Sequence, residues 1–116
     1  PDDFVIATEE THTVREFLEE AFSILGADYK SYILEDSRFR RPAEVPALLG
    51  NSTKSKNILK WEPKVKFKDL VKMMVVADLK EWMEKKGIIP VDPYNKNSES
   101  IYLTKGRELL ESRFKI

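Results

Sequence analysis

The sequence contains no cysteine and only one histidine, His12, among its 116 residues. Disulfides and thiolate metal sites are therefore excluded, and nothing in the chain requires an oxidising compartment. His12 has no partner histidine and stands just ahead of a predicted helix. We interpret it as a loop residue that makes local hydrogen bonds, not as a metal ligand or a general base.

An excess of one charge and a long apolar run are also missing. Twenty Lys and Arg residues balance twenty Asp and Glu residues, so no net field draws the chain to a nucleic acid or an acidic membrane. No apolar run approaches the roughly 20 residues of a membrane span, and Pro1-Asp2-Asp3 is not the basic start of a signal peptide. We expect a cytoplasmic protein with no membrane partner, whose phosphate binding, if any, is local.

Seven lysines between Lys54 and Lys72, with Trp61 among them, leave one alternative open. Such a run is typical of a nucleic-acid-binding module, in which lysines pair with phosphates and aromatic rings stack on bases. Glu62 and Asp69 interrupt the run, and the net charge of the chain is zero. A solvated helix surface is therefore the preferred interpretation, and we expect no nucleic-acid partner.

Glycine is scarce, and the few glycines lie far apart in the sequence, at Gly26, Gly50, Gly87 and Gly106. A glycine-rich phosphate loop or a dinucleotide-binding fingerprint needs closely spaced glycines between a strand and a helix, so neither is present. No tyrosine is followed four positions later by lysine. The sequence therefore offers no catalytic residue and no cofactor-binding residue.

Four helices are predicted from capping residues and apolar spacing. The first follows a capping box formed by Thr13 and Glu16 and ends before Gly26. A short helix capped by Asn51 or Ser52 runs through Leu59, and the longest spans Phe67 to about Lys85, with a broad apolar stripe. The last is expected from Lys105 to Phe114, with Thr104 as its cap.

Two or three short strands are also predicted, which makes the fold class α+β. Residues 4–8 and 29–34 are rich in branched and aromatic side chains, and 45–49 is a short extended segment. A buried strand with almost nothing before it suggests a piece of something larger. From residue 87 the composition changes to prolines and a polar run at 95–100, so we divide the chain into a main part, 1–86, and a linker with a helical extension, 87–116.

The segment RFRRPAEVPALLG, residues 38–50, is the strongest candidate binding site. Pro42 restricts its own backbone and that of Arg41, so the side chains of Arg41 and Glu44 can be presented from a defined turn. A guanidinium suits a bidentate phosphate contact, and an ionised carboxylate accepts hydrogen bonds from sugar hydroxyls. Ion pairs of the arginines with Glu35 and Asp36 are an equally good explanation from the residues alone.

Two long stretches, PDDFVIATEETHTVREFLEEAF and RRPAEVPALLGNSTKSKNILKWEPKVKFKDLVKMMVVADL, resemble the C-terminal part of the GDP-mannose 4,6-dehydratases. These are extended short-chain dehydrogenases/reductases that act on nucleotide sugars, and the resemblance runs from residue 1 to about residue 82. It implies the small substrate-binding part of a Rossmann-type NAD(P)-binding enzyme, which makes the fold α/β-derived. It also implies that Arg41 binds the diphosphate of the nucleotide sugar and Glu44 its ribose, with no role for Arg38 or Arg40.

The resemblance places the NADP-binding half and the Thr/Glu/Tyr/Lys catalytic set of the family upstream of residue 1. We therefore expect no cofactor in this chain and no activity of the chain alone, although its family consists of lyases. The expected partners are GDP-mannose or a related nucleotide sugar, together with a separate nucleotide-binding half or a second copy of the chain. Self-association would bury an apolar face that otherwise stays exposed.

The chain departs from the family pattern at three positions. Glu9 stands where the family usually has Gly, and Pro46 and Asn51 each stand where Asp is usual. The tail beyond residue 86 has no family counterpart. These departures keep an alternative open, a stand-alone protein-interaction domain that reuses the fold.

Overall fold

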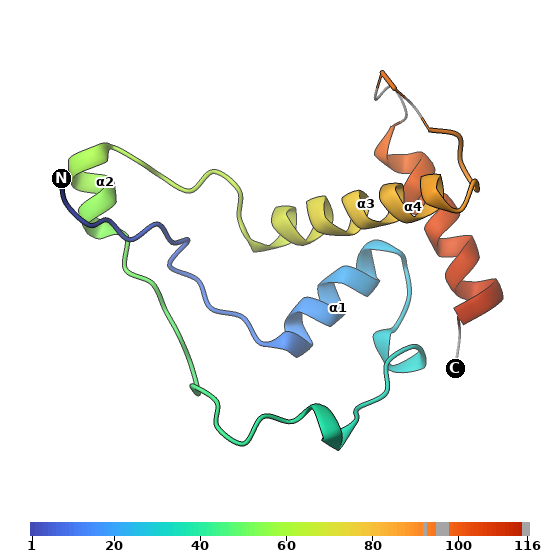
Figure 1. The fold of residues 1–116 in the computed structure, drawn as a ribbon, viewed down its shortest axis with the longest axis horizontal. Coiled ribbons are helices and arrows are strands. Elements are labelled where there is room, and N and C mark those ends of the chain that lie inside the picture. Colours follow the sequence, from blue (N-terminus) through green and yellow to red (C-terminus); the bar gives the residue numbers. More distant parts are fainter. Residues whose placement is uncertain (92, 95–97, 115–116) are drawn as a thin grey trace.

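The computed structural model describes residues 1–91, 93–94 and 98–114. Three longer helices, α1, α3 and α4, pack together at one end, while the short α2 lies apart beside the N-terminal segment (Figure 1). In chain order the elements are α1 (Val14–Ile24), the 3₁₀ helices η1 (Tyr29–Ser31) and η2 (Ser37–Phe39), α2 (Thr53–Leu59), α3 (Phe67–Lys85), α4 (Glu99–Leu109) and the π-helical turn η3 (Leu110–Phe114).

The ends of α1 form as the sequence predicts. The backbone N–H of Glu16 donates to Thr13 Oγ1 at 3.1 Å, and the Glu16 carboxylate accepts from the backbone N–H of Thr13, which completes the capping box. After the helix, Gly26 has a φ of 68°, a conformation that glycine adopts without steric cost. The predicted bounds of α2 and α3 are also confirmed, and Asn51 Oδ1 accepts from the Thr53 N–H at 3.0 Å at the start of α2.

The hydrophobic core lies where α4 packs against α3. Met83, Tyr102 and Leu109 are buried there and are flanked by Leu79, Trp82, Ile88 and Ile89. The absence of a side chain at Gly106 lets α4 come close, because a Cβ at that position would lie 3.1 Å from Leu79 Cδ1. Arg107 Nε donates to the Leu25 carbonyl at 2.7 Å, so α4 also closes the C-terminal end of α1.

A second set of contacts joins the N-terminal segment to the start of α2, and we call it the clasp (residues 2–9 with 50–56). Ser55 Oγ donates to the Val5 carbonyl at 2.5 Å, and Lys54 Nζ donates to the Asp3 carbonyl at 2.9 Å. A Cβ on Gly50 would lie only 2.5 Å from Ala7 Cβ, so the two segments pass as closely as their backbones allow. The clasp closes a loop of more than forty residues that contains α1, η1 and η2.

The α+β prediction is wrong for the part of the chain that the structure describes, because its regular elements are all helical. Residues 4–8 and 45–49 have no regular secondary structure, and the predicted strand at 29–34 begins instead as η1, capped by Asp28. A strand needs a neighbouring strand to accept its hydrogen bonds, and β propensity depends strongly on that context. These segments keep strand-like sequences without such a neighbour.

The last helix begins at Glu99, after Ser98, and not at Lys105 as predicted. Thr104 lies inside α4 and is not its cap, and Gly106 lies inside the helix as well. The polar run read as a linker at 95–100 therefore contributes its last two residues to the helix, while residues 95–97 lie outside the described part. A glycine disfavours a helix interior by about 1 kcal/mol, and here the absence of a Cβ leaves room for Leu79 of α3.

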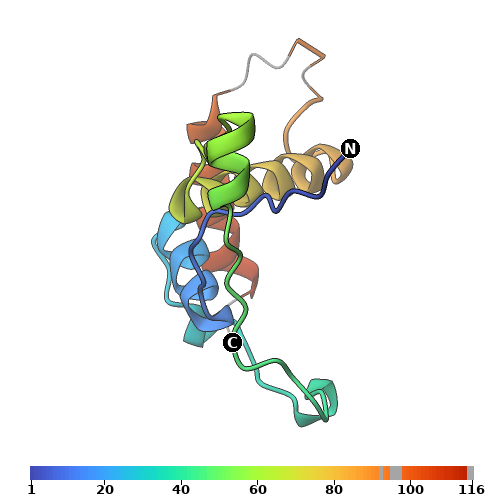
Figure 2. The same ribbon diagram turned by 90° about the vertical axis from the view of Figure 1, so that its left-hand side faces the viewer.

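The molecule is more expanded than a compact domain of its size. Its radius of gyration is 18.1 Å, against about 13 Å expected for a compact chain of this length. The segment from η1 to α2 runs away from the three-helix layer, as Figures 1 and 2 show. Along it, Phe39 is 82% exposed and Leu48 is 75% exposed, so a large apolar surface faces solvent.

The core position of Met83 predicts a large loss of stability in Met83→Ala. Removing a fully buried methionine side chain lowers the free energy of unfolding by about 2–5 kcal/mol, because it leaves a cavity in the contact between α3 and α4. Met73→Ala on the same helix is the matched control: Met73 is 55% exposed, so its loss should stay within about 0.5 kcal/mol. Urea unfolding followed by far-UV circular dichroism measures both, and equal losses would contradict this account of the core.

Candidate functional site

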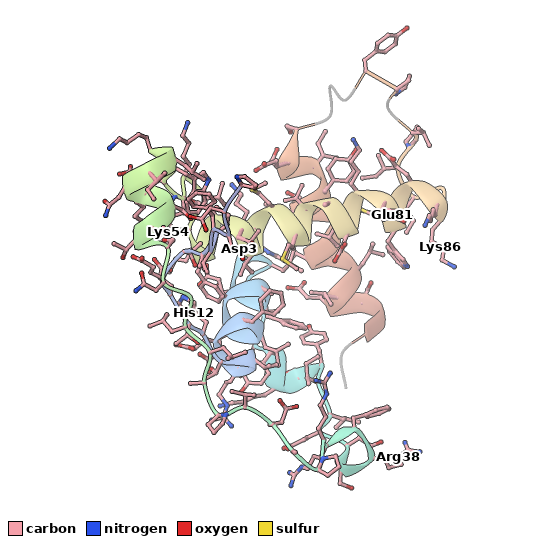
Figure 3. All side chains as sticks on the ribbon, turned by 60° about the vertical axis from the view of Figure 1, so that its left-hand side comes forward. Asp3, His12, Arg38, Lys54, Glu81 and Lys86 are labelled. Atoms are coloured by element: carbon pink, nitrogen blue, oxygen red, sulfur yellow. The ribbon has the colours of Figure 1, made fainter. Side chains whose placement is uncertain are left out.

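The arginine cluster begins at η2, which Asp36 organises. The Asp36 carboxylate accepts from the backbone N–H of Arg38 at 2.9 Å, and from the Arg38 guanidinium through Nη2 at 2.6 Å and through Nε at 2.9 Å. The Arg38 side chain, followed by the Arg38 backbone N–H, lowers the pKa of Asp36 below its ordinary value. Figure 3 shows that Arg38 lies well away from Lys54.

Arg40 is also engaged within the chain. Its Nη2 lies 2.6 Å from Glu35 Oε1. The interpretation of the cluster as a set of internal ion pairs is therefore correct for Arg38 and Arg40, which take up Asp36 and Glu35. Arg41 pairs with neither of these two carboxylates and lies instead near Glu44.

Arg41 and Glu44 lie side by side on the segment that follows, on either side of Pro42 and Ala43. Arg41 Nε lies 3.5 Å from Glu44 Oε1, and the two side chains are 78% and 63% exposed. An exposed ion pair of this length contributes little to stability, about 0–1 kcal/mol. The guanidinium and the carboxylate are thus both open to an incoming molecule.

A hollow of about 680 Å³ lies beside η2, between α1 and the segment from η1 to Arg40. Its volume falls within the range of small-molecule sites. Arg15, Lys30 and Arg40 line it together with Glu35 and Asp36, so cations and carboxylates face the same space. Arg41 and Glu44 follow directly after this lining along the chain.

Most of the lysines in the run at 54–72 form ion pairs with carboxylates of the same chain. Four of its lysines form ion pairs, which are Lys54 with Asp2 at 2.8 Å, Lys56 with Glu9 at 2.7 Å, Lys66 with Glu10 at 3.8 Å and Lys72 with Glu99 at 3.0 Å. Carboxylates this close to the lysines offset the positive field that draws a protein to a phosphate backbone. The ion pairs therefore favour the solvated surface over the nucleic-acid-binding alternative.

His12 has a structural setting that fits local interactions. Its ring stacks on Phe67 with centroids 3.7 Å apart, and its Nε2 lies 3.4 Å from Glu10 Oε2 (labelled in Figure 3). The stack joins the start of α1 to the start of α3. Within the described residues, no group of three His, Cys, Asp or Glu side chains could hold a metal ion, and no helix is long and apolar enough to cross a bilayer.

Glu9 is the residue of consequence that sequence reasoning missed. Its Oε1 accepts from the backbone N–H and from the Oγ of Ser52, both at 3.1 Å, and its Oε2 accepts from Lys56 Nζ at 2.7 Å. The Lys56 ammonium first, then the two Ser52 groups, lower the pKa of Glu9. The partners lie 43 and 47 residues away, so no local pattern could have revealed them.

Comparison with known proteins finds one family along most of the chain. The sequence model of the GDP-mannose 4,6 dehydratase family matches residues 1–74. The chain is 54% identical over 79 residues to GDP-mannose 4,6 dehydratase 2 of Arabidopsis thaliana, and 40% identical over 96 residues to the human GDP-mannose 4,6 dehydratase. Each match covers 68% of this chain but only 21% and 26% of those relatives, so the chain spans about a fifth to a quarter of their length.

The arrangement at η2 makes a prediction about which arginine is engaged. Arg38→Ala should return the pKa of Asp36 toward its ordinary value near 3.8, because the guanidinium that holds it down is gone. Arg41→Ala should leave the pKa of Asp36 unchanged, since Arg41 faces Glu44. Titration of the carboxyl ¹³C resonances by NMR measures the midpoint in each variant. A midpoint that moves with Arg41 and not with Arg38 would reverse the assignment.

Proposed function

The chain belongs to the GDP-mannose 4,6-dehydratase family, and we propose that it forms part of the binding site for GDP-mannose or a related nucleotide sugar. Arg41 contacts the diphosphate, and Glu44 accepts hydrogen bonds from the ribose hydroxyls. The observation that supports the proposal is that the three arginines differ in their ion-pair partners. Arg38 and Arg40 are engaged by Asp36 and Glu35 at 2.6 Å, whereas Arg41 has only a 3.5 Å contact with Glu44.

The chemistry of the pair suits a nucleotide diphosphate. A guanidinium presents parallel N–H donors to phosphate oxygens, and such a charge-assisted contact contributes about 1.5–3 kcal/mol. A carboxylate only accepts, so Glu44 is matched to hydroxyl donors and repels phosphate. A ligand must separate Arg41 from Glu44 to reach both, and the cost is small because the ion pair is exposed.

The residues of this chain do not fit NADP, the cofactor that the resemblance implies for the family. Gly26 and Gly87 follow helices, Gly50 precedes α2 at the clasp, and Gly106 lies inside α4. None of them opens a glycine-rich turn into a helix, which is what binds a dinucleotide diphosphate. We propose that the chain contributes substrate contacts only, and that another polypeptide portion supplies the cofactor and the catalytic groups.

The exposed apolar surface supports a protein partner. Leu34, Phe39, Val45, Leu48 and Leu49 are all more than half exposed along the same segment as Arg41. Large apolar side chains left exposed along one segment are typical of an interaction site. We propose that this segment packs against a nucleotide-binding half or, when the chain is alone, against a second copy.

Isothermal titration calorimetry of the purified chain with GDP and with GDP-mannose tests the binding site. We expect binding at millimolar or tighter affinity and, in Arg41→Ala, a loss of about ten- to a hundredfold, which corresponds to one charge-assisted phosphate contact. Arg40→Ala is the matched control, because Arg40 is held by Glu35. It should bind as the wild type does.

No heat from a folded wild-type chain would refute the binding role and would favour a stand-alone interaction domain. Equal losses of affinity in Arg40→Ala and Arg41→Ala would mean that the ligand is attracted by positive charge in general and not by a specific contact with Arg41. The same preparation, supplied with GDP-mannose and NADP, should form no dehydrated sugar nucleotide; a product detected by chromatography would contradict the proposal that the catalytic groups lie elsewhere.

Self-association is expected for the isolated chain as its concentration rises. Sedimentation velocity should show species heavier than the 13.5 kDa monomer, because association buries the exposed apolar segment. Replacing Phe39 and Leu48 with serine should shift the distribution toward monomer. Val91→Ser, at an apolar position that is also more than half exposed but lies away from that segment, serves as the control. A wild-type chain that stays monomeric at every concentration would contradict the proposed partner surface.

A further inference from the structure

Glu9 has a backbone conformation that is uncommon for a residue with a side chain. Its φ is 60°, in the left-handed region, where a Cβ meets the neighbouring backbone. A non-glycine residue stays there only when its surroundings hold it. The three hydrogen bonds of the Glu9 carboxylate, to Ser52 N, Ser52 Oγ and Lys56 Nζ, are what holds it.

The Glu9 carboxylate supplies negative charge to the first turn of α2. Two side chains accept hydrogen bonds from backbone N–H groups there, Glu9 at Ser52 and the neutral amide of Asn51 at Thr53. A carboxylate at a helix start is favoured by the free N–H groups and by the helix dipole. Ser52 is fully buried beneath these contacts, so this turn is the most enclosed part of the clasp.

The first turn of α2 is also where the segment that carries Arg41 and Glu44 ends. This segment leaves η2, which Asp36 and Arg38 stabilise, and has no helix or strand until Thr53 (Figure 1). Its side chains from Arg41 to Leu49 are exposed, so packing along its length does little to fix it. The position of this segment therefore depends on its two ends, η2 and the start of α2. Glu9 stabilises the end at α2.

We propose that Glu9 is a positioning residue for the Arg41–Glu44 pair. By tying the start of α2 to the N-terminal segment, it reduces the freedom of the segment that presents the pair, so that less conformational entropy is lost when a nucleotide diphosphate binds. The inference rests on the proposed function. Glycine at position 9 would adopt the same φ but would bring no carboxylate to α2.

The test compares variants that differ in charge and hardly in shape. Glu9→Gln keeps the size of the side chain but loses the charge that pairs with Lys56, and the other clasp contacts, from Ser55 and Lys54, remain. We expect GDP binding to weaken about two- to tenfold, the range expected when about one more side chain must be ordered on binding. Amide hydrogen exchange at residues 52–56 should become faster in the same variant.

Rescue separates positioning from a general effect of charge. Adding Asn51→Asp to Glu9→Gln returns a carboxylate to the same end of α2 but does not join it to the N-terminal segment, because the hydrogen bonds of the side chain at position 51 are with Thr53 of α2 itself. It should slow the exchange in α2 again without restoring the GDP affinity. Glu10→Gln is the matched control: it removes a neighbouring carboxylate whose contact with Lys66 is only 3.8 Å. It should leave binding and α2 exchange as in the wild type.

Two results would overturn the positioning role while the proposed function stands: Glu9→Gln binding GDP as tightly as the wild type, or Glu10→Gln weakening binding to the same extent as Glu9→Gln. Full recovery of the GDP affinity by Asn51→Asp would also count against it, because a carboxylate at position 51 does not join the two segments. A wild-type chain that binds no GDP would refute the proposed function itself, and the positioning role would be refuted with it.

Discussion

The clasp between the N-terminal segment and the start of α2 is the constraint on which the rest of the molecule depends. It joins residues more than forty positions apart, where Val5 meets Ser55, Ala7 meets Gly50 and Glu9 meets Ser52. Closing a loop of that length costs entropy that grows only slowly with length, so a few well-made hydrogen bonds can maintain it. Without the clasp, the segment with Arg41 and Glu44 would be anchored only at η2.

The parts of the fold that the sequence predicts well are those decided by near neighbours. The capping box at Thr13 and Glu16, the stop at Gly26 and the bounds of α3 depend on side chains within one turn of each other. The strands at 4–8 and 29–34 were predicted wrongly because a strand is defined by its partner, which local sequence does not contain. The start of α4 was missed because Gly106 looks like an interruption until its contact with Leu79 is seen.

For the candidate site too, local sequence indicates which residues are of interest but not which distant residues they contact. Residue pattern and family resemblance singled out Arg41 and Glu44, but the pattern alone could not say which arginines pair with Glu35 and Asp36. That allocation depends on the short turn at η2, where Asp36 binds both the backbone and the side chain of Arg38. Glu9 was visible in the sequence only as a departure from the family, because its partners lie on a different part of the chain.

The fit of α4 at Gly106 couples the stability of the region that matches the family to that of the residues after it. The family match ends at residue 74, whereas α4 begins at Glu99, so the seam at Leu25, Leu79 and Gly106 joins α1 of the matched region to sequence beyond it. A larger side chain at Gly106 would need a smaller one opposite, and loss of Arg107 would uncover the carbonyl of Leu25. A substitution on one side of this contact therefore changes the loss of stability that a substitution on the other side causes, so the two effects are not additive.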